Sequence, residues 1–136
     1  MPSTNDKDAP NGGASGLRGL RVLVVEDTWL VAKALKTVLE GMGMVVAGPA
    51  ANTADAERLV AEETPHLAVV DVNLKGEMAY GLIDRMHDRG VRVVVVSGYA
   101  VLPNATKKAA AILQKPFSGA ELQATLCQVM NLGRTH

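Results

Sequence analysis

Three carboxylates have the clearest chemical potential in this sequence, because each comes directly after a short apolar run. Glu26 and Asp27 follow the run RVLVV at 21–25, and Asp71 follows LAVV. Neighbouring carboxylates repel each other, and a group of three cannot all ionise without raising one another's pKa. A divalent cation would relieve that repulsion, and all-oxygen ligation by carboxylates and water suits Mg²⁺. The histidines are scattered along the chain and indicate no zinc site.

Two further polar residues, Ser97 and Lys115, end apolar runs in the same manner. An aspartate can act as a nucleophile and form an aspartyl phosphate, and phosphoryl transfer requires neutralisation of the phosphoryl oxygens. Mg²⁺, the Lys115 ammonium and the Ser97 hydroxyl would each serve one of those oxygens. This set of groups suits phosphoryl transfer to Asp71, whereas no Ser-His-Asp arrangement supports acyl transfer.

Each of these residues also has an ordinary structural explanation when it is taken alone. An aspartate at the end of a strand often forms a turn, and Glu26 and Asp27 could simply complement the dipole of a following helix. Ser97 begins an ordinary Ser-Gly turn, and Lys115 belongs to a common Lys-Pro dipeptide. The five residues together, each at the end of an apolar run, favour a shared site.

The chain alternates short Val-rich runs with segments of helical periodicity. Strands are expected at 21–25, 44–48, 66–74 (ending at Asp71), 91–98 and 109–114, and helices at 29–43, 52–63, 80–90 and 118–130. This alternation indicates right-handed βαβ units. We therefore predict an α/β fold, a doubly wound five-stranded parallel sheet with about five helices on its two faces. Because parallel strands share one carboxyl edge, the polar residues that follow them should converge there.

Composition limits the class of protein. The 136 residues include 14 Lys and Arg and 14 Asp and Glu, so no basic excess indicates a nucleic-acid or membrane partner. The single cysteine, Cys127, cannot form an internal disulfide, and no apolar run reaches the length of a membrane span. We expect a cytoplasmic protein with a flexible tail at 1–16 and one domain at 17–134.

The motifs that carry these residues resemble the receiver domain of two-component response regulators over roughly residues 20–130. They are the acidic pair in VVEDTWL, the VVDVNL around Asp71, the SGYA that begins at Ser97, and the LQKPFS that contains Lys115. The resemblance implies a flavodoxin-like fold. It also implies that Asp71 accepts a phosphoryl group from a sensor histidine kinase or a phosphotransfer protein, with Ser97 as the switch hydroxyl and Lys115 as a partner of the phosphoryl group.

The resemblance assigns the ligands of Mg²⁺ as well. Asp27 and Asp71 would bind the ion directly, Glu26 would bind it through water, and Asn73 would offer its backbone carbonyl. Lys115 would pair with Asp27 and would precede a cis peptide bond.

A finer likeness is to the alphaproteobacterial receivers of the general stress response, through DVNLKGE and SGYA. Ile112 stands where receivers usually carry a switch aromatic, and Tyr99 is the nearby aromatic that would replace it. The stretch from Ser97 to Lys115 is roughly four residues shorter than usual, so we expect helix 4 to be short or frayed. Our hypothesis is that phosphorylation orders residues 98–108 through Ser97.

Trp29, Leu30 and Val31 are three consecutive apolar residues at the start of a predicted helix, and they cannot all face the sheet. One or two of them should be exposed beside the acidic residues, where a helix of the kinase would dock. The alternative is that Trp29 folds back over its own helix.

These inferences predict a single-domain response regulator that signals through a downstream protein target or acts as a phosphate sink. It would assist its own phosphorylation and dephosphorylation, and would not be an enzyme with a separate substrate. The alternatives are a receiver excised from a hybrid histidine kinase, an interaction module without the chemistry, and a flavodoxin-like or phosphatase-like ligand-binding domain. The last is disfavoured because no Gly-rich phosphate loop follows the first strand, and no second acid stands two residues after Asp27.

Overall fold

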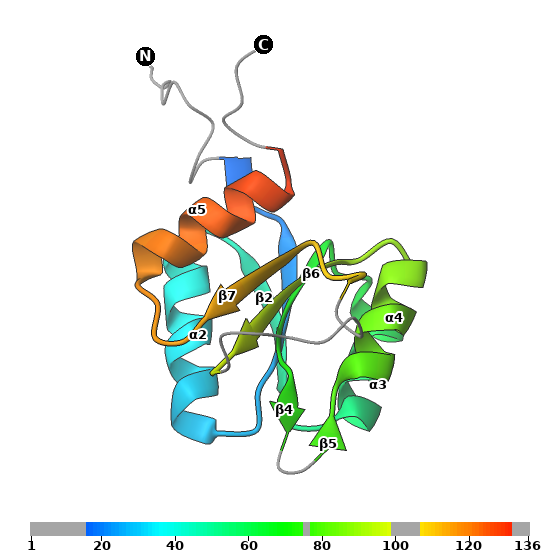
Figure 1. Cartoon of the computed structure of the whole chain (residues 1–136). Helices are drawn as coiled ribbons and strands as arrows, with labels where there is room; N and C mark the ends of the chain where they lie inside the picture. The colour runs from blue at the N-terminus through cyan, green and yellow to red at the C-terminus, as the bar shows by residue number, and fades with distance from the viewer. Residues whose placement is uncertain (1–15, 75–76, 99–106, 132–136) are drawn as a thin grey trace, which may run out of the picture.

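Five parallel strands form one sheet in the order β2-β1-β3-β6-β7 (Figure 1). They belong to a computed structural model that describes residues 16–74, 77–98 and 107–131. The strands are β1 (Arg21–Val25), β2 (Val45–Ala50), β3 (Leu67–Asp71), β6 (Arg92–Ser97) and β7 (Ala111–Gln114). The inner strands β1, β3 and β6 are mostly buried, and valine is their commonest residue, as strands covered on both faces require. The predicted five-stranded parallel sheet is confirmed.

Four helices among the described residues cover the two faces of the sheet (Figure 1). They are α2 (Trp29–Gly41), α3 (Thr53–Glu63), α4 (Tyr80–Asp88) and α5 (Gly119–Val129). Leu39 of α2 and Leu126 of α5 pack in one hydrophobic cluster, whereas Val60 of α3 and Ile83 of α4 pack in a second. Successive residues of the inner strands alternate between these clusters, so the doubly wound arrangement is as predicted.

Most elements begin or end within two residues of their predicted bounds, and two segments also differ in how they pair with other strands. β2 begins at Val45 and continues through Ala50, past the predicted end at residue 48. Gly48 adopts φ +89°, which lets the backbone bend and then pair with β1 again at Ala50. After Asp71, the short strands β4 (Asn73–Leu74) and β5 (Glu77–Met78) form an antiparallel pair that the sequence did not predict.

Several predictions concern residues outside the described ranges. One is the flexible tail at 1–16, of which only residue 16 is described. The others are the short or frayed helix 4, the proposed ordering of 98–108, and the role of Tyr99, which all depend on residues 99–106. Leu17, the first residue of the predicted domain, is fully buried in the cluster that contains α2 and α5. In the described part of the chain, no helix has both the length and the apolar character needed to cross a membrane.

Ser118 stands three residues before Glu121, a spacing that predicts a capping box, and helix α5 begins with one. The Ser118 hydroxyl accepts a hydrogen bond from the Glu121 amide at 3.0 Å, and the Glu121 carboxylate accepts one from the Ser118 amide at 2.8 Å. These bonds satisfy two backbone donors that the helix itself cannot satisfy. They also fix where α5 starts relative to Lys115, three residues earlier.

We expect Ser118→Ala to lower the free energy of unfolding by about 1 kcal/mol, because the amide of Glu121 loses its acceptor. Thr125→Ala is the matched control. The Thr125 hydroxyl donates to the Glu121 carbonyl within the same helix at 2.8 Å, but it caps no free amide. Its removal should change the free energy of unfolding by no more than a few tenths of a kcal/mol. Urea denaturation followed by circular dichroism measures both variants, and equal losses would contradict the capping role.

Candidate metal centre

The five predicted polar residues all lie at the carboxyl ends of neighbouring strands. Glu26 and Asp27 follow β1, Asp71 ends β3, Ser97 ends β6 and Lys115 follows β7. Because β1, β3, β6 and β7 are adjacent in the sheet, their carboxyl ends share one edge. The predicted convergence therefore follows from strand order alone, without a long loop.

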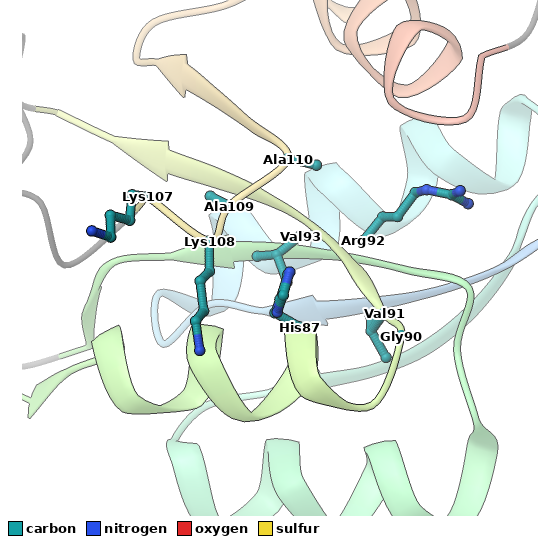
Figure 2. Close-up of a pocket in the computed structure, with 9 residues that line it drawn as sticks. All are labelled: His87, Gly90, Val91, Arg92, Val93, Lys107, Lys108, Ala109 and Ala110. Atoms are coloured by element: carbon teal, nitrogen blue, oxygen red, sulfur yellow. The ribbon is translucent and has the colours of Figure 1, made fainter.

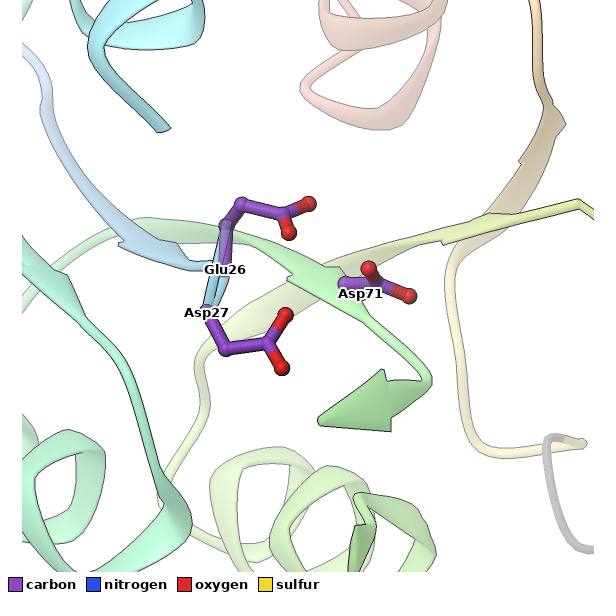
Figure 3. Close-up of side chains that lie close together, drawn as sticks. All are labelled: Glu26, Asp27 and Asp71. Atoms are coloured by element: carbon purple, nitrogen blue, oxygen red, sulfur yellow. The ribbon is translucent and has the colours of Figure 1, made fainter. Parts of the chain in front are cut away.

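The three carboxylates form a compact cluster at this edge. One oxygen each from Glu26, Asp27 and Asp71 lies within 4.8 Å of the others, and Figure 3 shows the side chains meeting from the ends of β1 and β3. Glu26 is only 3% exposed and Asp71 9% exposed, whereas Asp27 is half-buried. Two of the three acidic groups are therefore largely removed from bulk water.

Lys115 supplies positive charge to this cluster. Its Nζ lies 3.2 Å from Asp71 Oδ2 and 3.7 Å from Glu26 Oε1. The Lys115 amide also donates to the Ser97 carbonyl at 2.8 Å, which ties the end of β7 to the end of β6. The peptide bond between Lys115 and Pro116 is cis, as the resemblance implied.

The partner of Lys115 differs from the expected one in this structure. The resemblance implied a pair with Asp27, but the ion pairs of Lys115 with described residues are to Asp71 and Glu26. Asp27 is the most solvated of the three carboxylates, so the ammonium gains more by lying beside the two that have lost their water.

Backbone amides hold two of the carboxylates in place. Asp71 Oδ1 accepts a hydrogen bond from the Asn73 amide at 3.1 Å, and Glu26 Oε2 accepts one from the Thr28 amide at 3.0 Å. Thr28 is the N-cap residue of α2, and its own side chain makes no capping hydrogen bond. The Glu26 carboxylate therefore contributes both to the start of α2 and to the acidic cluster. The explanation that it complements the dipole of the following helix is thus also partly correct.

Burial raises the pKa of Glu26 above its ordinary value of 4.5, and the nearby Asp71 carboxylate raises it further. The Thr28 amide and the Lys115 ammonium lower the same pKa, but they do not cancel the effect of burial. Three carboxylates face one ammonium, so negative charge remains in excess at this edge. A set of close, poorly solvated oxygen donors with excess negative charge fits a hard divalent cation such as Mg²⁺.

Ser97 is fully buried at the end of β6, and its carbonyl accepts the bond from Lys115. The assignment of its hydroxyl as a switch stays a prediction. Ile112, which stands at the position of the usual switch aromatic, is 50% exposed on β7. The contact between Asn73 and Asp71 is made by the Asn73 backbone amide. The backbone carbonyl of Asn73 stays a predicted ligand.

The start of α2 exposes apolar side chains beside the acidic cluster. Trp29 is 66% exposed, Leu30 70% and Val31 37%, so all three of these residues face solvent, where one or two were expected to. Lys33 Nζ lies 5.0 Å from the centre of the Trp29 ring, so the indole also contacts its own helix. Trp29 is therefore exposed and also contacts its own helix, and its role in docking stays a prediction.

Sequence reasoning missed an apolar groove that extends from this surface. Its volume is about 190 Å³, and it lies between α2 and the start of α5, with Val31, Val38 and Phe117 among its lining residues. Val31 and Val38 are seven residues apart in a helical segment, so their periodicity could have indicated a second apolar stripe on α2. The contribution of Phe117 depends on tertiary structure.

Comparison with known proteins gives a consistent result. Residues 22–127 match the family described as the response regulator receiver domain. No curated protein matches the chain significantly.

Several solved structures are similar to the chain. A response regulator from Burkholderia pseudomallei, crystallised with a phosphorylated aspartic acid, a calcium ion and citrate, is 28% identical with a TM-score of 0.73, covering 82% of this chain and 69% of that one. The response regulator TrrA from Thermotoga maritima, in complex with Mg²⁺ and BeF, is 18% identical with a TM-score of 0.74, covering 81% and 98%. PhyR from Brucella abortus is 22% identical with a TM-score of 0.75, covering 89% of this chain and 51% of that one.

We expect Glu26→Gln to raise the stability of the metal-free protein at neutral pH by about 1 kcal/mol, because it removes a buried charge from an acidic cluster. A raised pKa means that the folded protein keeps the Glu26 proton to higher pH than the unfolded chain does. The advantage of the variant should therefore be full above the folded pKa, and should disappear as the pH falls to the ordinary value of 4.5.

Denaturation with a chelator present, at several pH values, measures this difference. Added Mg²⁺ should stabilise the wild type more than the variant, and so reduce or reverse the order of stability. The exposed Glu40, on α2, provides the control: Glu40→Gln should change the free energy of unfolding by no more than a few tenths of a kcal/mol at any of these pH values. The prediction would be contradicted if Glu26→Gln had a lower free energy of unfolding than the wild type, by the same amount at every pH.

Proposed function

Because the chain belongs to the response regulator receiver domain family, we propose that Asp71 accepts a phosphoryl group from the phosphohistidine of a histidine kinase or phosphotransfer protein. The observation that carries this proposal is the cluster of Glu26, Asp27 and Asp71, whose oxygens lie within 4.8 Å of one another. Lys115 Nζ completes it at 3.2 Å from Asp71. Mg²⁺ would be held directly by Asp27, Asp71 and the Asn73 carbonyl and through water by Glu26, and when bound it would neutralise charge on the phosphoryl oxygens.

The transfer joins one carboxylate oxygen of Asp71 to phosphorus while the bond between phosphorus and the donor imidazole nitrogen breaks. The electron pair of that bond returns to the imidazole, and because a proton is held on the other ring nitrogen of the phosphohistidine, the ring leaves as neutral imidazole. Asp71 is already oriented for this step, since the Asn73 amide holds Oδ1. Oδ2 is the oxygen that Lys115 contacts, so the nucleophile and its charge partner are adjacent before the donor arrives.

Lys115 and Ser97 would stabilise the product. As negative charge moves from the Asp71 carboxylate to the phosphoryl group, the Lys115 ammonium would follow it by a short movement of a flexible side chain. The Ser97 hydroxyl, at the end of the adjacent strand β6, would donate to another phosphoryl oxygen. Attack by water would later return the free carboxylate and phosphate, so the protein would assist its own phosphorylation and dephosphorylation without a separate substrate.

The exposed apolar surface at the start of α2 supports a docking role in the same reaction. Trp29 and Leu30 lie within a few residues of Glu26 and Asp27, so a helix seated on them would carry its phosphohistidine toward the acidic cluster. The groove that begins at Val31 would extend the contact along α2. We propose this surface as the contact for the kinase or phosphotransfer protein.

The phosphorylated protein would signal by binding a downstream protein. Alternatively, it would act as a phosphate sink that removes phosphoryl groups from the kinase. A single-domain regulator in the cytoplasm is the role that we propose for the chain. Both routes need only the receiver fold and a reversible change at Asp71.

Incubation with phosphoramidate and Mg²⁺ should add one phosphoryl group to the wild-type protein, as measured by intact mass. Asp71→Asn should remove the gain, because an amide oxygen is a poor nucleophile. Asp84→Asn, on α4 and away from the cluster, is the matched control and should leave the gain unchanged. A chelator should abolish the reaction in every protein. A phosphoryl gain that persists in Asp71→Asn would disprove the assignment.

Replacing Trp29 and Leu30 together by alanine should slow phosphotransfer from a phosphorylated histidine-containing donor protein by about tenfold or more, because apolar contact area is lost. The rate with phosphoramidate should stay within about twofold of wild type, since that donor needs no docking surface. Val45→Ala removes another exposed side chain, at the opposite end of the sheet, and should affect neither rate. Equal slowing with both donors would place the two residues in the chemistry instead of in docking.

A further inference from the structure

Two short strands, β4 and β5, connect the metal centre to helix α4. Figure 1 shows them side by side at one end of the sheet, with α4 following β5. Only Val72 separates Asp71 from β4, and only Ala79 separates β5 from α4. The antiparallel pair of β4 and β5 is therefore a direct backbone link between the acidic cluster and the start of α4.

This pair is held at both of its ends. The Val72 amide donates to the Val96 carbonyl of β6 at 3.2 Å, and the Val72 carbonyl accepts from the Ala79 amide at 2.9 Å. Val72, Leu74 and Ala79 are all buried in the cluster that contains α3 and α4. Ala79 is also the N-cap residue of α4, and its side chain makes no capping hydrogen bond. The start of α4 is therefore held by the β4–β5 pair instead of by a polar cap.

The pairing also determines where the backbone groups of Asn73 point. Positions in an antiparallel ladder alternate between those that bond to the partner strand and those that point away from it. Because Ala79 donates to Val72, the next position, Asn73 opposite Met78, is one that points away. The Asn73 amide agrees with this, since it donates to Asp71 Oδ1 at 3.1 Å.

An extended residue presents its N–H and its C=O at the same edge of the strand. The Asn73 carbonyl is therefore directed to the side on which the Asp71 carboxylate lies. That carboxylate belongs to the acidic cluster with Glu26 and Asp27. The β4–β5 pair thus turns the Asn73 carbonyl toward the metal centre, which supports its predicted role as a ligand on physical grounds.

Leu74 is the residue that can hold Asn73 in this position. Asn73 is exposed, so burial of its own side chain does not fix it. Leu74 follows it directly, is buried, and stands at a hydrogen-bonded position opposite Glu77. A smaller side chain at Leu74 would leave a cavity into which β4 can shift, and the Asn73 carbonyl would shift with it.

We propose that the β4–β5 pair positions the Asn73 carbonyl for the metal ion, with Leu74 as the positioning residue, and that metal binding in turn orders the start of α4. The inference rests on the proposed metal centre and adds a regulatory consequence to it. Coupling of this kind is reciprocal, so a better ordered β4–β5 pair favours the ion as much as the ion favours the ordered pair.

Mn²⁺ binding to the full chain tests the positioning role, because Mn²⁺ prefers the same oxygen ligands as Mg²⁺ and its free form is measured by electron paramagnetic resonance. Leu74→Ala should weaken Mn²⁺ affinity by about tenfold, as loss of support for a metal ligand commonly does. Leu74→Met should keep the affinity within about twofold, because it conserves the buried volume. Leu74→Val should weaken the affinity less than Leu74→Ala, and it serves if the alanine variant does not fold.

Met86→Ala is the matched control. Met86 is buried in the same cluster as Leu74, but it lies near the end of α4 and not in the β4–β5 pair. Its truncation should also lower the free energy of unfolding, yet it should leave the Mn²⁺ affinity within about twofold. The comparison is made where circular dichroism shows both variants to be folded, so that a loss of stability alone does not move the readout.

Amide hydrogen exchange tests the coupling to α4. Saturating Mg²⁺ should slow exchange at the Leu74, Ala79 and Ile83 amides by about fivefold or more, because these amides belong to the β4–β5 pair and the first turn of α4. The last turn of α4 is the internal reference. Figure 2 shows His87 in that turn, close to Gly90, where the chain turns toward β6. Exchange there should change by no more than about twofold.

Four results would overturn the proposal. They are an equal Mn²⁺ affinity of Leu74→Ala and wild type, an equal loss of affinity in Leu74→Ala and Met86→Ala, no effect of Mg²⁺ on exchange at the start of α4, and no Mn²⁺ binding by the wild type at roughly millimolar concentration.

The phosphoryl acceptor role is tested separately, since Mn²⁺ binding needs no phosphodonor. A wild type that gains a phosphoryl group from phosphoramidate, while Leu74→Ala binds Mn²⁺ normally, would refute the positioning role alone. A Leu74-dependent Mn²⁺ affinity without any phosphoryl gain would support the positioning role and refute the acceptor role.

Discussion

Three carboxylates meet at the carboxyl edge of the sheet, and a single ammonium group opposes the repulsion among them. Glu26 and Asp71 have lost most of their water, and the pKa of Glu26 is raised as a result. Lys115 relieves part of this unfavourable charge but not all of it. Repulsion among the three carboxylates therefore remains, and a hard cation or another cationic group that binds there would stabilise the folded protein further. That imbalance is the physical basis of the proposed chemistry.

The same interactions connect the acidic cluster to its surroundings. Glu26 accepts the amide of Thr28 and so acts at the start of α2, the helix whose exposed residues form the proposed docking surface. Lys115 is bound through its own backbone to the Ser97 carbonyl, and Ser118 begins α5 three residues later. The acidic cluster is therefore connected to α2, to the end of β6 and to the start of α5, and the proposed change of charge at Asp71 would act on all three.

The acidic side chains gather after the carboxyl ends of β1 and β3, in a chain whose formal net charge is zero. The metal centre is therefore a local concentration of negative charge at one edge of the sheet. The described strands β1, β3 and β6 are covered on both faces, whereas Ile112 on the edge strand β7 is exposed.

The order of apolar runs and polar residues was sufficient to predict the parallel sheet, the convergence of Asp71 with Glu26 and Asp27, and the cap at Ser118, because these depend on local periodicity and on strand polarity. Strand pairing decided what local pattern could not. It carried β2 past Gly48, because pairing with β1 outweighs the tendency of a Gly-Pro pair to end a strand. It also placed Lys115 against Asp71 and Glu26, since an ion pair depends on which carboxylates lose their water, and only the packed protein determines that.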